Sequence, residues 1–193
     1  MNKSVIILLA LCLALIGGQA HAQRYLPGQK GLQITASAVD GFNLKQGDKQ
    51  AFAGGIALAT YTKNGNRWVF GGEYLQKSYL YKTELLPTAQ FTVEGGYYYK
   101  FLSDPSKTVF FSVGASAMAG YETVNWGEKL LPDGSTITSE DNYLYGGALT
   151  FEVETYLSDR IVLLLNVQER ILGGSSVNMF HTTIGAGLKF ILN

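Results

Sequence analysis

The stretch Gln90–Phe101, QFTVEGGYYYKF, alternates residue by residue between apolar and polar side chains. Phe91 and Val93 would lie on one face of an extended chain, and Glu94 and Lys100 on the other. A period of two is the pattern of a β-strand with one apolar and one polar face. The same alternation recurs in strand-length blocks to the end of the chain, and no segment has the periodicity of a helix of ordinary length. The chain is therefore expected to be all-β.

The start of the chain has the three parts of a secretory signal peptide. Lys3 supplies a positive charge, residues 5–16 are apolar, and an A-x-A cleavage motif follows. The residues that define cleavage are Ala20, Ala22 and Gln23. The apolar stretch is shorter than the roughly 20 residues that a membrane-spanning helix needs. We expect a cleaved signal peptide over residues 1–22 and one exported domain over residues 23–193.

The composition excludes several functions. The one cysteine, Cys12, lies within the signal peptide, so the mature chain has no disulfide, thiolate metal site or cysteine nucleophile. The chain has 15 basic and 15 acidic residues, and loss of Lys3 leaves one net negative charge, so no direct nucleic-acid binding is expected. The 12 tyrosines suit a membrane interface, because each has an apolar ring and a polar hydroxyl.

Turns divide the exported domain into eight alternating blocks. The blocks cover residues 31–39, 51–61, 67–81, 88–101, 108–126, 143–157, 161–172 and 178–192. Asn64-Gly65 favours a tight hairpin turn, a connection containing Pro87 precedes the fourth block, and the longest loop covers residues 127–142. Connections after the second, fourth and sixth blocks are tight, as in barrels whose two ends face different compartments. These features predict an eight-stranded antiparallel up-and-down outer-membrane β-barrel.

The two faces of the strands predict a lipid-facing wall and a polar interior. The residues expected to face lipid are Phe91, Val93, Tyr97, Phe111, Val113, Phe151, Val153, Leu163 and Leu165. The charges expected inside are Glu73, Lys77, Glu94, Lys100, Glu152, Glu154, Arg170 and Lys189. A basic side chain that faced lipid at mid-membrane would cost about 2–4 kcal/mol.

Two interpretations of the interior charges remain open. They line a path for ions or substrate, or they form a salt-bridged plug. Because an eight-stranded barrel is just wide enough for side chains to fill, the plug is favoured. Glu152 and Glu154 lie two residues apart on one strand face, and Arg170 on the next strand is expected to balance their charge.

The mature chain has one histidine, His181, with Ser175, Ser176, Thr182 and Thr183 nearby in sequence. A Ser–His pair with a carboxylate could hydrolyse an acyl group. The serines, however, follow glycines in a loop, and no nucleophile-elbow motif is present. A single histidine with no cysteine provides no metal-ligand spacing. We predict no enzymatic activity and no cofactor or metal.

Three segments resemble a known family. They are residues 23–33, QRYLPGQKGLQ, residues 40–42, DGF, and residues 169–175, ERILGGS. The chain resembles the TraO family of Bacteroidetes conjugative transposons over essentially the whole mature sequence. The resemblance implies an outer-membrane barrel in the conjugal transfer apparatus and supplies no active-site residues.

The first functional hypothesis is a structural outer-membrane component of a conjugative DNA-transfer apparatus that anchors or docks other transfer proteins. Its expected partners are outer-membrane lipid and those transfer proteins, and an oligomer is possible. An even strand count places both termini in the periplasm, where residues 23–30 would form a short free docking segment. The alternatives are a general small outer-membrane barrel with an adhesive or envelope-stabilising role, and a lipid-modifying enzyme centred on His181.

Overall fold

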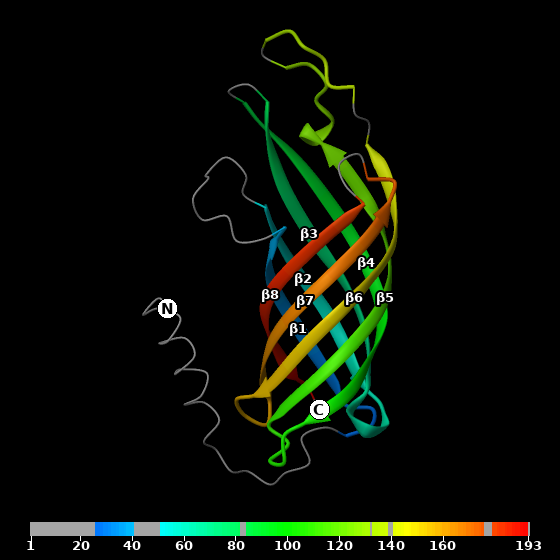
Figure 1. The fold of residues 1–193 in the computed structure, drawn as a ribbon, viewed down its shortest axis with the longest axis vertical. Helices are drawn as coiled ribbons and strands as arrows, with labels where there is room; N and C mark the ends of the chain where they lie inside the picture. The colour runs from blue at the N-terminus through cyan, green and yellow to red at the C-terminus, as the bar shows by residue number, and fades with distance from the viewer. Residues whose placement is uncertain are drawn as a thin grey trace, which may run out of the picture.

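The computed structural model describes residues 26–40, 51–81, 84–131, 133–138, 141–175 and 179–192 (Figure 1). The eight strands are β1 (Lys30–Val39), β2 (Ala51–Tyr61), β3 (Arg67–Tyr81), β4 (Glu84–Ser103), β5 (Val109–Val124), β6 (Asn142–Tyr156), β7 (Ile161–Gly173) and β8 (Phe180–Ile191). The signal-peptide prediction, with its cleavage residues Ala20, Ala22 and Gln23, lies outside the described residues. Among those described, no helix is long and apolar enough to cross a membrane.

The strands form one closed antiparallel barrel in which each strand pairs with its neighbours in sequence. Closure is made by β1 and β8, which pair in register from Gly31 with Ile191 to Val39 with Thr183. The central parts of all strands therefore have hydrogen-bond partners on both edges, which leaves no open sheet edge there. The predicted all-β, eight-stranded up-and-down barrel is confirmed.

The two ends of the barrel differ in their connections (Figure 1). At one end, here called the terminal end, β1 begins, β8 finishes and short turns join the other strands. One of these turns is the 3-10 turn Lys63–Gly65, where Asn64 and Gly65 have φ of 66° and 79°. Asn and Gly tolerate such positive φ values, as the sequence predicts. At the opposite end, here called the loop end, lies the longer connection from β5 to β6, which contains the 3-10 turn Asn125–Gly127.

Two predictions about connecting segments were wrong. Pro87 belongs to β4 and not to a connection: it pairs with Ser78 of β3, whereas the ladder between β4 and β5 begins only at Thr88. Proline is tolerated there because the start of β4 is an edge. The N-terminal segment is not free where it is described, because the Gly28 N–H donates to the Tyr61 carbonyl over 2.8 Å.

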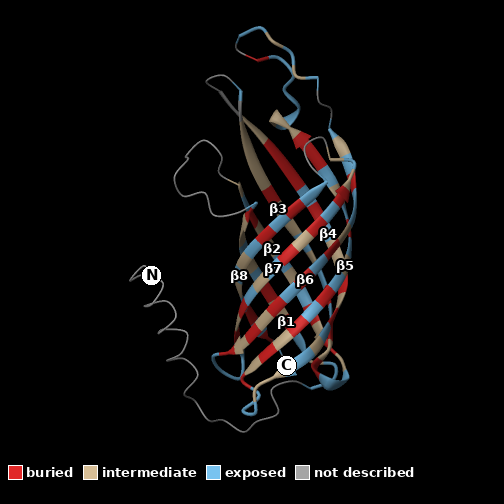
Figure 2. Ribbon diagram, in the orientation of Figure 1, coloured by how far each residue is buried: buried red, intermediate tan, exposed pale blue. Residues whose placement is uncertain are grey.

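Burial alternates along each strand in the sense opposite to that of a soluble protein (Figure 2). On β6, Glu152 and Glu154 are buried, while their neighbour Phe151 is 42% exposed. Since apolar side chains cover the outside and charges lie inside, the exterior is suited to lipid rather than water.

Candidate functional site: the charged barrel interior

The inward faces of the strands bring polar side chains together in three groups along the barrel. The terminal-end cluster consists of Tyr61, Arg67, Ser112, Glu152, Glu154 and Lys189. The central cluster consists of Glu73, Glu94, Thr150, Gln168 and Arg170. The loop-end cluster consists of Asp40, Lys77 and His181.

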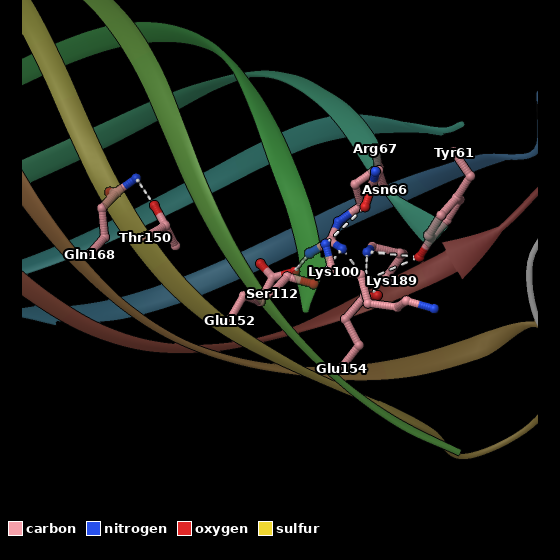
Figure 3. Close-up of polar contacts among 10 residues, drawn as sticks. All are labelled: Tyr61, Asn66, Arg67, Lys100, Ser112, Thr150, Glu152, Glu154, Gln168 and Lys189. Atoms are coloured by element: carbon pink, nitrogen blue, oxygen red, sulfur yellow. Dashed lines mark hydrogen bonds and ion pairs between the residues drawn. The ribbon is translucent and has the colours of Figure 1, made fainter. Parts of the chain in front are cut away.

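Arg67, at the start of β3, is the centre of the terminal-end cluster (Figure 3). Its guanidinium is fully buried, donates to Glu152, and lies 3.3 Å (Nη1 to Oε2) from Glu154. The same Nη1 donates to Ser112 Oγ over 3.1 Å, and the guanidinium lies 4.9 Å from the centre of the Tyr98 ring. Arginine suits this position because its planar fork of donors can serve several acceptors at once.

Lys189 of β8 completes the terminal-end cluster (Figure 3). Its buried ammonium contacts Glu154 and donates to the Tyr61 hydroxyl over 3.1 Å, and that hydroxyl donates to Glu154 Oε1 over 3.0 Å. Two cations, Arg67 and Lys189, thus contact two carboxylates, Glu152 and Glu154. Buried charges are tolerated only when they are paired in this way.

Next to this cluster, apolar side chains fill the interior. The buried group consists of Tyr61, Phe110, Tyr156, Val162, Leu164 and Ile191. Tyr61 belongs to both groups, because its ring packs here and its hydroxyl reaches Glu154. The Phe110 and Tyr156 rings meet edge to face, with centroids 5.5 Å apart. The terminal half of the barrel is therefore filled by side chains.

In the central cluster, Arg170 is the organising cation. Its Nη2 lies 2.5 Å from Glu73 Oε1, and its Nε donates to Gln168 Oε1 over 2.8 Å. The amide nitrogen of Gln168 in turn donates to Glu94 over 3.2 Å and to Thr150 Oγ1 over 3.1 Å. This network links the walls of the barrel from β3 and β4 to β6 and β7.

The loop-end cluster is more open. Asp40 follows β1 and accepts from Lys77 Nζ at 2.5 Å, with His181 Nδ1 3.2 Å from the same oxygen. The side chains of Asp40 and Lys77 remain 31% and 19% exposed. Burial raises the pKa of the Asp40 carboxyl, but the hydrogen bonds from Lys77 and His181 outweigh it and hold this pKa below its ordinary value.

The structure places every predicted interior charge on an inward face. These are Glu73, Lys77, Glu94, Lys100, Glu152, Glu154, Arg170 and Lys189. The predicted lipid-facing residues point outward: Phe91, Val93, Tyr97, Phe111, Val113, Phe151, Val153, Leu163 and Leu165. One pairing was wrong, because Arg170 contacts Glu73, and the partners of Glu152 and Glu154 are Arg67 and Lys189.

Sequence reasoning missed Arg67 and Glu122 as interior network members. Alternation alone places Arg67 on the same face of its strand as Glu73, so the signal for it was present. Glu122 is buried near the loop end and accepts from the Gln90 amide over 2.7 Å and from Ser175 Oγ over 2.9 Å.

The surroundings of His181 do not form a catalytic triad in the described part of the chain. Nδ1 faces Asp40, but Nε2 is buried with no hydrogen-bond partner there, and Ser175 donates to Glu122 instead. No group of three or more His, Cys, Asp or Glu residues that could hold a metal occurs among the described residues. What this interior can do chemically is hold the wall together through paired charges.

A closed eight-stranded barrel with an apolar exterior and a paired-charge interior has the architecture of the small outer-membrane barrels. Residues 26–192 match the model of the family described as conjugative transposon protein TraO, so the chain belongs to the TraO family. The resemblance seen in the sequence is thereby confirmed. No match was found among curated proteins.

Two solved structures share the fold. Neisserial surface protein A is 14% identical, with a TM-score of 0.57 and coverage of 84% of this chain and 97% of that one. The attachment invasion locus protein Ail of Yersinia pestis, in complex with the heparin analogue sucrose octasulfate, is 12% identical. Its TM-score is 0.52, with coverage of 86% of this chain and 100% of Ail. At these identities the likeness concerns the fold.

Proposed function

We propose that this TraO-family protein is a structural outer-membrane component of a conjugative DNA-transfer apparatus, where it anchors or docks other transfer proteins. Membership of the TraO family supports a role in conjugative transfer. The observation that carries the structural role is the filled terminal half of the interior, where Arg67 and Lys189 are fully buried between carboxylates and apolar side chains.

The outer-membrane location is supported by the spacing of aromatic residues on the barrel exterior. Outward-facing aromatic residues stand ten positions apart on three strands: Phe91 and Phe101, Phe111 and Tyr121, Phe180 and Phe190. At about 3.4 Å per residue and a tilt of about 40°, ten residues span roughly 26 Å along the membrane normal. Outer-membrane barrels have an apolar band about 25 Å tall between aromatic girdles.

The same filling argues against a role as the DNA conduit. A nucleic acid would need an open passage lined by unpaired cations. Here the ammonium and guanidinium groups of the terminal-end cluster are paired with carboxylates and are shielded from solvent. The barrel is thus a fixed element of the membrane around which other transfer proteins assemble.

The proposed orientation puts both termini in the periplasm. The terminal end has short turns, whereas the connections from β1 to β2 and from β5 to β6 at the loop end are longer. This difference fits the orientation, because outer-membrane barrels have short periplasmic turns and longer outer loops. Periplasmic transfer proteins would then meet the short turns. The connection from β5 to β6 would face the exterior with Trp126 and Leu130, which are 58% and 72% exposed.

Deletion of the gene from the transposon, with the wild-type gene supplied in trans as a control, tests the proposal. We expect transfer frequency to collapse while growth and resistance to large antibiotics stay unchanged, because the envelope itself does not depend on the protein. Cross-linking in mating donors should then recover transfer proteins with the outer-membrane barrel. Normal transfer with a leaky envelope would instead support the general envelope role.

A further inference from the structure

The outer wall of the barrel contains an apolar groove of about 810 Å³ across β1 to β6. Gly54 of β2 and Gly72 of β3 lie in its floor, and Ile56 and Val93 in its sides. Towards the loop end the groove is bordered by aromatic residues: Tyr74, Phe91, Tyr121 and Tyr143. The groove is shallow and open along the outer wall.

The packing of the barrel does not explain why glycine stands at both floor positions. A Cβ added to Gly54 would come no nearer than 3.8 Å to another atom, and one added to Gly72 no nearer than 3.7 Å. At Gly71, by contrast, a Cβ would lie 2.7 Å from a backbone oxygen. Gly54 and Gly72 also lack a positive φ. Since glycine weakens a strand, the two glycines cost stability and leave the groove open.

The polarity of the groove changes along its length. Its floor and sides are apolar, but the hydroxyls of two tyrosines at its border donate hydrogen bonds to polar side chains. Tyr74 donates to Gln76 Oε1 over 2.7 Å, and Tyr121 donates to Asp141 Oδ2 over 2.9 Å. Asp141 follows the β5 to β6 connection, and the hydrogen bonds from Tyr121 and the Val124 N–H hold the pKa of its carboxyl below the ordinary value. The groove is therefore apolar in its floor and sides, and on its loop-end side it has a polar border that includes the Asp141 carboxylate.

We propose that this groove binds one acyl chain of a membrane lipid in the leaflet at the loop end, with the headgroup of that lipid at the tyrosine border. The groove is continuous with the lipid-facing wall, so hydrocarbon is what it meets in a membrane. Its order of apolar floor and polar border matches the order of groups along a single lipid molecule. The inference rests on the proposed membrane location and does not depend on the role in transfer.

Photolabelling of the purified full-length mature barrel tests the proposal. The barrel is placed in nanodiscs of phosphatidylethanolamine that include a fraction with a diazirine in one acyl chain, and labelled residues are mapped by mass spectrometry after irradiation. We expect label to concentrate on Ile56 and Val93. In the double variant Gly54→Leu, Gly72→Leu this label should fall about tenfold, which corresponds to about 1.4 kcal/mol of binding free energy.

The control is Ala115→Leu, a similar enlargement at an exposed position of β5 outside the groove, which should leave the labelling of Ile56 unchanged. Retained heat-dependent gel mobility shows that each variant is folded. If the double leucine variant does not fold, Gly54→Ala with Gly72→Ala replaces it and should give an intermediate loss. Equal labelling of Ile56 and Val113 in the inserted wild-type barrel, or cross-linking to a second copy, would overturn the lipid site. Failure to insert into nanodiscs would instead contradict the membrane location.

Discussion

The terminal-end and loop-end clusters use the same chemistry in different surroundings. At the terminal end, Arg67 and Lys189 are fully buried with Glu152 and Glu154, next to apolar side chains. At the loop end, the Asp40 side chain is 31% exposed, and its contacts with Lys77 and His181 connect the end of β1 to β3 and β8. The difference shows that burial decides what an ion pair does in this barrel.

A charge in the terminal-end cluster has no access to water when its partner is removed, so each member depends strongly on the others. A charge in the loop-end cluster can be solvated instead, and its pairing contributes little. The first cluster therefore fixes the filled interior, while the second joins the end of β1 to β3 and β8. The following substitutions separate these roles.

The largest effect is expected from Arg67→Met. The substitution removes the guanidinium that lies against both Glu152 and Glu154, and Lys189 contacts only the second of these buried carboxylates in the pairs described. The free energy of unfolding should fall by about 3–5 kcal/mol. Denaturant titration of the barrel in lipid vesicles measures it, with the exposed Arg160→Met as a matched control. A loss as small as that of the control would contradict the account.

An intermediate effect is expected from Arg170→Met in the central cluster. Glu73 loses a contact of 2.5 Å and Gln168 loses a donor, but the Glu73 side chain is 16% exposed and gains hydration. The free energy of unfolding should fall by about 1.5–3 kcal/mol, the usual contribution of hydrogen bonds to charged groups. The same titration measures it. A loss equal to that of Arg67→Met would show that burial does not determine how much each cluster contributes to the free energy of unfolding.

A small effect is expected from Lys77→Met at the loop end. The ammonium is partly solvated, so its pair with Asp40 should contribute about 0.2–1 kcal/mol. Because such pairs are screened by ions, the difference from wild type should shrink as salt is added. A loss of several kcal/mol that does not change with salt would show that the Lys77–Asp40 pair behaves like the buried pairs of the terminal end, and would contradict the comparison.

The smallest effect is expected in the pH dependence of Asp40. Its pKa is held below the ordinary value, so it contributes stability above the unfolded carboxyl pKa of about 3.9, and this contribution is lost as the pH falls through the folded value. Asp40→Asn should therefore differ from wild type near neutral pH and match it in acid. Asparagine tolerates the φ of 53° at this position, so the backbone is not strained. A stability difference between Asp40→Asn and wild type that grows as the pH falls would contradict the prediction.

The sequence predicted the closed barrel well because side-chain alternation is a local property that each strand carries by itself. The same alternation assigned Glu152 and Glu154 to the interior. It could not predict their partner, because Arg67 lies on β3 and reaches β6 across the interior. Such contacts depend on strand tilt and barrel closure, so the neighbouring Arg170 was a plausible but wrong choice. The groove over Gly54 and Gly72 depends likewise on six strands at once.

The central claim is that the barrel is a filled anchor and not a conduit, and conductance across a planar lipid bilayer tests it most directly. With the wild-type barrel inserted and insertion verified by its heat-dependent gel mobility, we expect no stable conductance steps at either polarity. The buried pairs of Arg67 and Lys189 leave ions no path through the terminal half. Long-lived, voltage-stable open steps from the wild-type protein would contradict the claim.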